Sequence, residues 1–274
     1  MTFSIVARSA DGETWGVATA SKFLGVGAVV PAARAGVGAI ATQALANTAY
    51  KTDGLAMLAG GQSAQAVVAA LTSADQGRDE RQLGIVDLLG GAATFTGSGC
   101  LDWAGGVTDD GVAIQGNILV GPEVVHEVHG AWLETDPATA LSERLLIALS
   151  AGDAAGGDRR GRQSAALLVV QAEAGYEHND DVLANLRVDD HSDPCGELHR
   201  LLGIHHMLFD PPDPEDLVAI EGAVAAEIAE HVAALGQPDL EAWVGTENYE
   251  MRVKDGFIDV HVLNELRKQA AVRR

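Results

Sequence analysis

The second residue of the chain is a candidate nucleophile. Thr2 follows Met1, so removal of the initiator methionine would leave a threonine with a free α-amine at the start of an apolar segment. An α-amine titrates at a pH of about 8 and can take the hydroxyl proton through a water molecule, so one residue would supply nucleophile and base. A small residue at position 2 is also common in proteins without this chemistry, and Thr2 could simply begin a strand. Ser4 would share its sheet face and is a second nucleophile if processing differs.

A group of charged residues in a glycine-rich loop is a candidate binding site. The group consists of Asp158, Arg159, Arg160 and Arg162. Arginine recognises carboxylates through paired hydrogen bonds. The loop could therefore bind a carboxylate-bearing substrate, or it could bind carboxylates of its own chain, such as Asp189 and Asp190.

Metal-binding patterns are sparse in this sequence. His126 and His129 are three residues apart on a predicted helix, which is not the spacing of the zinc peptidases. Asp189, Asp190 and His191 could ligate a cation together with Asp193, but Asp193 is predicted to cap the following helix. The chain has 2 cysteines, too few for a disulfide scaffold or a four-cysteine metal site. We expect no metal and no cofactor.

The composition limits the classes of partner. The chain has 274 residues, of which 47% are hydrophobic and 21% are charged, as in ordinary globular proteins. Its formal net charge of −21 disfavours binding to nucleic acid and to anionic membranes. No apolar run reaches the roughly 18 residues of a membrane span, and the N-terminus does not have the pattern of a secretion signal. We expect a cytoplasmic homodimer.

The elements that position these residues fall into blocks of strands separated by pairs of helices. Short apolar runs predict strands at 3–8, 14–20, 27–30, 36–42, 83–88, 92–96, 112–117, 165–172 and 186–189. Helical patterns cover 52–59, 63–74, 122–133, 138–151 and 194–208. Such blocks favour an α+β fold, with antiparallel sheets covered by helices.

A domain boundary is predicted where three prolines occur within residues 210–214. We expect one domain at 1–209 and a linker with a small all-α domain at 210–274, whose helices cover 214–235, 239–244 and 258–271. His205 and His206 precede the boundary, point about 100° apart on their helix, and are expected to be surface or packing residues.

Several motifs of the first domain resemble one family. They are TFSIVAR (2–8), ASKF (20–23) with VGAVVP (26–31), RAGVGA (34–39) with TQ (42–43), DWAG (102–105), QGNIL (115–119), GGDRRGRQS (156–164) and LRVDDH (186–191). In this order they resemble a bacterial family of unknown function that is grouped with the N-terminal nucleophile (Ntn) hydrolases. The resemblance implies a four-layer αββα sandwich.

The resemblance also implies a mechanism and a set of residues. Thr2 would attack an amide carbonyl, its α-amine would shuttle the proton, and water would hydrolyse the acyl-enzyme. Asn117 could donate to the oxyanion, or form a Gly-Asn turn; Lys22 could lower the pKa of the amine, or be an exposed strand-end residue. The expected catalytic residues are Thr2, Lys22 and Asn117. The expected substrate-binding residues are Ser21, Gln43, Asp158, Arg159, Arg162, Asp190 and His191.

The second domain resembles a helical module described as peptidoglycan-binding-like, through PEDL (214–217), AWVGTENYE (242–250) and IDV (258–260). It could bind a recycled cell-wall fragment, or serve only in packing or dimerisation. The leading interpretation is an amidohydrolase acting on a small amide or peptide-like bond. The alternatives are a non-catalytic module that binds a wall fragment or a protein, and a compartmentalised peptidase-like assembly.

Overall fold

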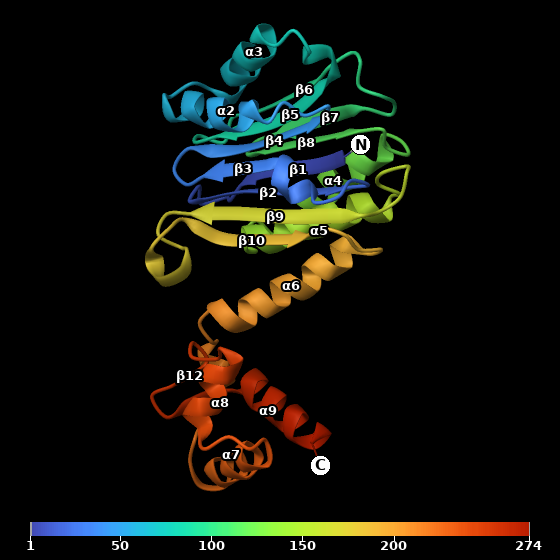
Figure 1. Cartoon of the computed structure of the whole chain (residues 1–274). Coiled ribbons are helices and arrows are strands. Elements are labelled where there is room, and N and C mark those ends of the chain that lie inside the picture. Colours follow the sequence, from blue (N-terminus) through green and yellow to red (C-terminus); the bar gives the residue numbers. More distant parts are fainter. Residues whose placement is uncertain (1, 274) are drawn as a thin grey trace. The chain divides into compact units, whose positions relative to one another are not determined.

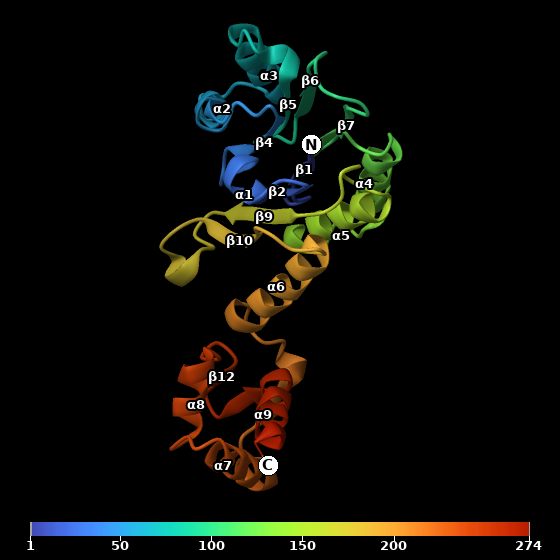
Figure 2. The ribbon, with the colours of Figure 1, turned by 45° about the vertical axis from the view of Figure 1, so that its right-hand side comes forward.

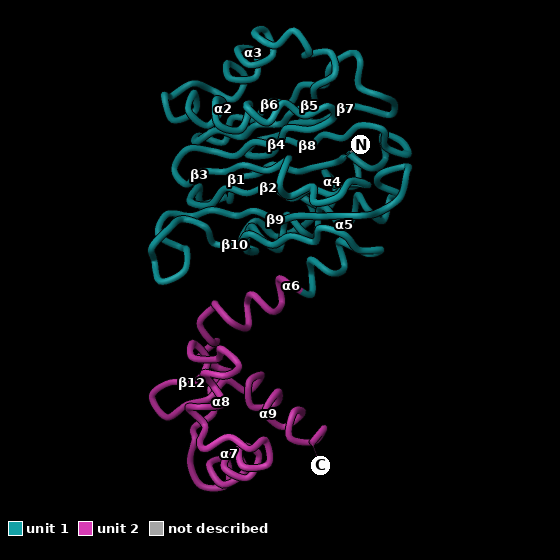
Figure 3. The backbone as a smooth tube through the Cα atoms, in the orientation of Figure 1, with its two compact units in different colours: residues 1–200 teal, residues 201–274 magenta. Residues whose placement is uncertain are grey.

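A computed structural model describes residues 2–273 of the chain. The chain divides into two compact units, residues 1–200 and 201–274 (Figure 3). The division falls within helix α6 (Pro194–Phe209), whose first turn is capped by Asp193 as expected, because its carboxylate accepts from the Gly196 N–H at 3.2 Å. Both units combine helices with antiparallel strands, which confirms the mixed α+β class.

The first unit contains an antiparallel six-stranded sheet with strand order β10-β9-β2-β1-β8-β7 (Figure 1). Its strands are β1 (Thr2–Arg8), β2 (Thr14–Ser21), β7 (Gly105–Asp109), β8 (Val112–Asn117), β9 (Ser164–Gln171) and β10 (Val182–Val188). The predicted hairpin at the N-terminus is confirmed, since β1 pairs with β2 from Phe3 opposite Ala20 to Arg8 opposite Trp15. The strand that begins at Thr2 therefore lies inside the sheet, between β2 and β8.

A second, four-stranded sheet faces the first. It has the order β3-β4-β5-β6, with β3 (Pro31–Arg34), β4 (Gly38–Ala44), β5 (Arg81–Asp87) and β6 (Ala92–Thr96). β4 packs against β1, and β5 against β8. Buried side chains from both sheets meet in one apolar cluster, among them Val6, Val17, Ala39, Val86 and Ala113. Alternation along each strand sends the intervening residues to the opposite face.

Helices pack on the other face of each sheet (Figures 1 and 2). α2 (Ala49–Ala59) and α3 (Ala64–Ala74) contact the four-stranded sheet, and α4 (Glu123–Glu134) and α5 (Leu141–Ala154) contact the six-stranded sheet. Ser63 caps α3 as predicted, accepting from the Ala66 N–H at 3.3 Å. Gly152 leaves room for the ring of Phe3, since a Cβ there would lie 3.1 Å from it.

One strand prediction for the first unit is wrong, and one strand is missed. The expected strand at 27–30 is wrong: residues Val26–Val29 form a single helical turn, α1, which follows Gly25 at φ 65°. The strand starts only at Pro31, after the Val30 N–H has closed that turn on the Val26 carbonyl. β7 was not predicted, because a glycine-rich edge strand lacks the apolar alternation of a buried strand. Two single 3-10 turns, Arg78–Glu80 and Tyr176–His178, complete this unit.

The prediction of an all-α second domain is wrong. Beside α7 (Gly222–Ala234), α8 (Leu240–Glu247) and α9 (Val260–Val272) it has a small antiparallel sheet of order β11-β13-β12. The strands are β11 (Leu217–Ala219), β12 (Val253–Lys254) and β13 (Phe257–Asp259), and a 3-10 turn, Pro214–Asp216, precedes them. Gly222 at φ 52° interrupts the expected helix at 214–235, which leaves the segment before it free to pair with β13.

Candidate functional site

Thr2 lies at one end of the six-stranded sheet, beside two polar strand ends. It is the first residue of β1 and is paired in register with Asn117, the last residue of β8. Its side chain is almost fully buried, with 6% exposed. Its Oγ1 lies 3.1 Å from the Oγ of Ser21, the last residue of β2. The expected removal of Met1 lies outside the described residues.

The carbonyl of Thr2 is held by two side-chain amides. Gln43 donates to it at 3.2 Å and Asn117 at 3.4 Å. The Oε1 of Gln82 accepts from the same two amides, at 2.8 Å from Gln43 and 2.9 Å from Asn117. Both hydrogens of the Asn117 amide are thus engaged, so in this arrangement its side chain holds the backbone of Thr2 in place.

Ser4 belongs to the same buried polar network. Its hydroxyl donates to Gln43 Oε1 at 2.6 Å and accepts from Gln115 Nε2 at 2.6 Å. The network occupies the inter-sheet space at the end where Thr2 lies. The Ser4 hydroxyl is therefore already used as donor and acceptor inside the sandwich, whereas the Thr2 hydroxyl faces the hydroxyl of Ser21.

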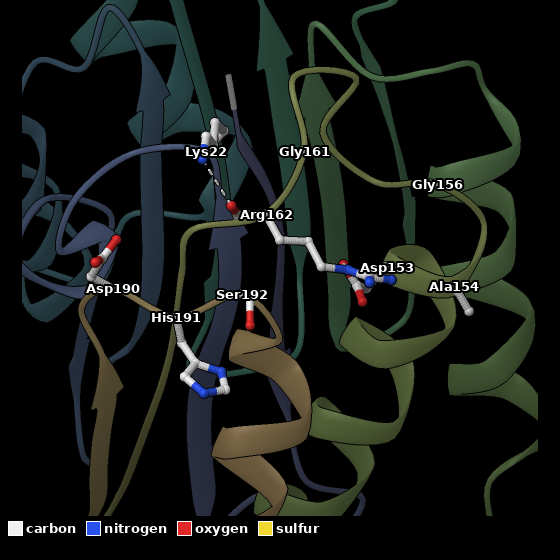
Figure 4. A pocket seen from close by; sticks show the side chains of 9 residues that line it. All are labelled: Lys22, Asp153, Ala154, Gly156, Gly161, Arg162, Asp190, His191 and Ser192. Atoms are coloured by element: carbon white, nitrogen blue, oxygen red, sulfur yellow. Dashed lines mark hydrogen bonds and ion pairs between the residues drawn. The ribbon is translucent and has the colours of Figure 1, made fainter.

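A pocket of about 600 Å³ opens in the first unit near this sheet end (Figure 4). Its polar lining comprises Lys22, Asp153, Arg162, Asp190, His191 and Ser192. These residues come from the end of β2, the end of α5, the loop before β9 and the loop between β10 and α6. The structure thus brings together four of the expected site residues that are far apart in the sequence.

A second, much smaller cavity shares part of its lining with this pocket. It measures about 10 Å³, roughly the space of one water molecule, and Ser21 and Asp158 line it. It shares Asp153, Gly161 and Arg162 with the larger pocket. Ser21, whose hydroxyl contacts the Thr2 hydroxyl, thus lines the small cavity, whereas Thr2 is not among the lining residues of either cavity.

The charged loop is organised by ion pairs and backbone contacts. The Asp158 carboxylate accepts from the backbone N–H groups of Lys22, at 2.7 Å, and of Arg160, at 2.9 Å. The Lys22 ammonium donates to the Arg162 carbonyl at 3.2 Å. Arg162 donates through Nε to Asp153 at 2.8 Å, and this contact raises the pKa of the Arg162 guanidinium. The loop therefore combines carboxylates of the chain with cationic groups that border the pocket.

The remaining expected binding residues have different surroundings. Asp190 accepts from Gln163 Nε2 at 3.0 Å, and the His191 Nδ1 lies 2.8 Å from the Asp193 carbonyl. Arg159 is exposed, and its backbone N–H donates to the Ile118 carbonyl at 3.4 Å. Gln43 is buried beside Thr2 and away from the surface, with 1% exposed.

Gln82 is a site residue that the sequence analysis missed. It is fully buried in β5 and donates to the Gly116 carbonyl at 2.7 Å in addition to accepting from Gln43 and Asn117. The sequence signal that could have identified Gln82 is its position. It is a polar residue at the start of the apolar run LGIV, in a strand whose side chains alternate between the two faces of the sheet.

One histidine group has a geometry that could suit a metal. His205, His206 and Asp210, in the second unit, each offer a ligand atom within 4.8 Å of the others. The His206 Nδ1 already lies 2.5 Å from an Asp210 carboxylate oxygen, and the His205 ring packs on Phe209 at 5.0 Å between centroids. Among residues 2–273, the residues around Asp190 that were considered as cation ligands do not form such a group.

Two facing sheets with helices on their outer sides define an α+β protein, and its first strand begins with a buried hydroxyl in a polar network at the end of one sheet. The chain belongs to a family of unknown function, DUF1028, whose sequence model matches residues 2–198. No curated protein matches the chain.

Solved structures lead to the same family. The chain is similar to the crystal structure of protein SPO2555 from Silicibacter pomeroyi, a DUF1028 protein, with 32% identity and a TM-score of 0.67. The similarity covers 82% of this chain and 92% of that one. Within residues 2–273, the structure contains no helix with the length and apolar character needed to cross a membrane.

Proposed function

We propose that this chain is an Ntn-type hydrolase that cleaves a small amide or peptide-like bond with Thr2 after Met1 has been removed. The observation that carries the proposal is the placement of the Thr2 hydroxyl, 3.1 Å from the Ser21 hydroxyl at the end of an interior strand. The grouping with the Ntn hydrolases and their four-layer αββα sandwich is part of the proposal. It is supported by the packing of helices, two sheets and helices in the first unit.

The proposed reaction has two stages. In the first, Thr2 Oγ1 attacks the amide carbon, a C–O bond forms, the C–N bond breaks, and the hydroxyl proton passes through the α-amine to the departing nitrogen. In the second, water hydrolyses the resulting ester, which releases the acid and restores the hydroxyl. Nucleophilic catalysis of this kind needs no group other than those of the chain and water.

The neighbouring residues have separate roles in this proposal. Ser21 orients the Thr2 hydroxyl through their 3.1 Å contact. Gln43 and Asn117 fix the Thr2 carbonyl, which keeps the nucleophile in one position. The positive charge of Lys22 favours the neutral form of the α-amine, the form that can act as a base.

A matched set of proteins tests the nucleophile. Untagged wild type, Thr2→Ala, Thr2→Ser and Ser192→Ala are treated with a β-lactone, which an attacking hydroxyl opens to form an ester. Intact mass and N-terminal sequencing then show whether Met1 is absent and where the adduct lies. We expect one adduct at residue 2 in wild type, Thr2→Ser and Ser192→Ala, and none in Thr2→Ala, because only residue 2 combines a hydroxyl with an α-amine.

Two results would reject the hydrolase. One is complete retention of Met1, because the α-amine of Thr2 would then be blocked. The other is an adduct that persists in Thr2→Ala. Either result would favour the alternative, a non-catalytic module for a cell-wall fragment or a protein partner.

A further inference from the structure

The end of helix α6 carries three side chains of the kinds that ligate metals. His205 and His206 lie near the C-terminal end of this helix, and Asp210 follows directly after its last residue, Phe209. Each of the three offers a ligand atom, and these atoms lie within 4.8 Å of one another. The group belongs to the second unit (Figure 3), whereas Thr2 and its polar network belong to the first. It is therefore separate from the candidate site around Thr2.

Helical spacing places His206 beside Asp210. Residues four positions apart lie on the same face of a helix, and the His206 Nδ1 lies 2.5 Å from the Asp210 Oδ2. The Asp210 N–H donates to the His206 carbonyl at 3.2 Å, which continues the helical hydrogen bonding by one residue. Pro211 then ends it, because the residue before a proline disfavours the helical conformation. An imidazole and a carboxylate are thus held side by side.

The ring of His205 lies close to this pair. Neighbouring residues leave a helix about 100° apart, so adjacency in the sequence does not by itself bring two side chains together. The His205 and His206 rings nevertheless lie 6.0 Å apart between centroids, at an interplanar angle of 89°. The His205 ring also packs on Phe209 at 5.0 Å between centroids, which limits its rotation. The second imidazole is therefore oriented by packing within the same turn of helix.

The backbone of this segment is anchored to the core of the second unit. Arg252 donates through Nη2 to the His206 carbonyl, and through Nη1 to the Asp259 carboxylate at 2.6 Å. Asp259 is completely buried and caps α9 through the His261 N–H. Contacts that support the residues bearing the ligands help to fix the geometry of a metal site. The end of α6 has such support through Arg252.

The ligand set selects the kind of cation. Imidazole nitrogens bind zinc and its neighbours among the transition metals, whereas Mg²⁺ and Ca²⁺ prefer oxygen ligands alone. Two histidines and one carboxylate form a zinc ligand set that leaves a fourth position for water. Ligand atoms on one tetrahedral Zn²⁺ lie about 3.3 Å apart. The three residues are half-buried, so rotation of their side chains can bring atoms that now lie within 4.8 Å to that separation.

We propose that His205, His206 and Asp210 bind one Zn²⁺ ion, with water at the fourth position. The charge of the second unit favours a cation, because residues 201–274 contain 14 acidic and 6 basic side chains. The bound ion joins the end of α6 to the first residue after it, and so stabilises the folded second unit. This inference differs from the sequence-based expectation of no metal, and it is independent of the proposed hydrolase.

Calorimetric titration of ZnSO₄ into full-length protein that has been freed of metal tests the site. The buffer contains Mg²⁺ in large excess, because Mg²⁺ occupies sites made only of carboxylates. We expect Zn²⁺ to bind with micromolar or tighter affinity and Mg²⁺ not to displace it. Co²⁺ serves as a spectroscopic probe of the same site, and the visible absorption of a four-coordinate ion is expected.

Four variants identify the ligands. His205→Gln, His206→Gln and Asp210→Asn should each weaken Zn²⁺ binding by at least about tenfold and abolish the Co²⁺ absorption. His231→Gln is the matched control. Its Nε2 also lies near a carboxylate four residues away, 3.5 Å from Glu227, but His231 belongs to no three-residue group in the described part of the chain. Zn²⁺ should raise the melting temperature of wild type and His231→Gln, and leave the three ligand variants unchanged.

Four outcomes overturn the inference. They are no binding of Zn²⁺, displacement of Zn²⁺ by Mg²⁺, unchanged affinity in the three ligand variants, and an equal loss of affinity in His231→Gln. Circular dichroism spectra of the metal-free proteins verify that each variant is folded. The β-lactone experiment concerns Thr2 in the first unit, so its result neither supports nor rejects the zinc site.

Discussion

Gln82 and Asn117 join the two sheets directly behind the candidate nucleophile. The Gln82 Oε1 accepts from the Asn117 amide at 2.9 Å, although the residues belong to β5 and β8 in different sheets. Because Asn117 also donates to the Thr2 carbonyl, the position of the first residue of β1 depends on the opposite sheet. Stability of the sandwich and geometry of the site are therefore linked through the same amides.

Truncation of Gln82 should destabilise the first unit strongly. Gln82→Ala removes the acceptor of two buried amides and a donor to the Gly116 carbonyl, and unsatisfied buried groups cost about 3 kcal/mol in total. Urea unfolding of Gln82→Ala and wild type measures the change. Gln65→Ala is the control, because Gln65 is exposed and donates to the Ala92 carbonyl at the surface, so its loss should cost less than about 1 kcal/mol. Equal effects in the two variants would contradict the role of the network.

Replacement of Gly84 by alanine should destabilise the first unit. A Cβ at this position would lie 1.9 Å from the Oε1 of Gln115, a side chain that is enclosed by the two sheets. Gly84→Ala should therefore displace Gln115 and lower the free energy of unfolding by about 1–3 kcal/mol. Gly130→Ala should act in the opposite direction, because Gly130 lies within α4 with open space around its Cα, and alanine is the better helix former by roughly 0.5–1 kcal/mol. Unfolding curves of the two variants measure both changes in the free energy of unfolding. Destabilisation by Gly130→Ala would contradict the open space around Gly130.

Asp75 should give the first unit a stability that is lost in acid. Its carboxylate accepts from Arg81 at 2.9 Å, Asn47 at 3.1 Å and Tyr50 at 2.8 Å, and these contacts hold its pKa well below the ordinary value of 3.8. A lowered pKa in the folded state stabilises the fold above the unfolded pKa, and this stabilisation disappears as the pH falls through the folded pKa. Wild type should therefore exceed Asp75→Asn in stability at neutral pH, with a difference that shrinks below about pH 4. Urea unfolding midpoints of the two proteins at pH 7, 5, 4 and 3 measure this difference in stability. A difference that grows as the pH falls would contradict a lowered pKa of Asp75.

The two-residue period of apolar positions in the sequence was sufficient to predict most of the strands of the first unit. Trp15 and Val17, or Ala39 and Ala41, recur at alternate positions because one face of each strand is buried against the other sheet. The segment at 26–30 has the same apolar composition, and its turn depends on the conformation of Gly25, which composition does not reveal. In the second unit, Leu217–Ala219 becomes a strand only because β13 lies beside it, a contact between residues about 40 positions apart.

The candidate site was less predictable than the fold. Thr2 and Asn117 could be singled out because their positions at the N-terminus and after a glycine are visible in the sequence. Gln82 could not, because its role depends on which strands face each other across the sandwich. The pocket depends on segments far apart in the sequence that meet only in the folded chain, so composition and motifs could not predict the pairing of Arg162 with Asp153.

The Arg252–Asp259 pair should be essential to the second unit. Asp259 is completely buried, accepts from Arg252 at 2.6 Å, and caps α9 through the His261 N–H at 2.7 Å. Asp259→Ala leaves the Arg252 guanidinium without its anion and removes the cap, so we expect a loss of about 3–5 kcal/mol. Hydrogen exchange in β11, β13 and α9 measures the effect on this unit, and exchange in β1 and β8 of the same sample reports on the first unit. Glu265→Ala is the matched control, because its partner Lys268 is exposed and the pair should contribute less than about 0.5 kcal/mol. Unchanged protection in Asp259→Ala would mean that the apolar cluster around Trp243 and Leu266 holds this unit together without the ion pair.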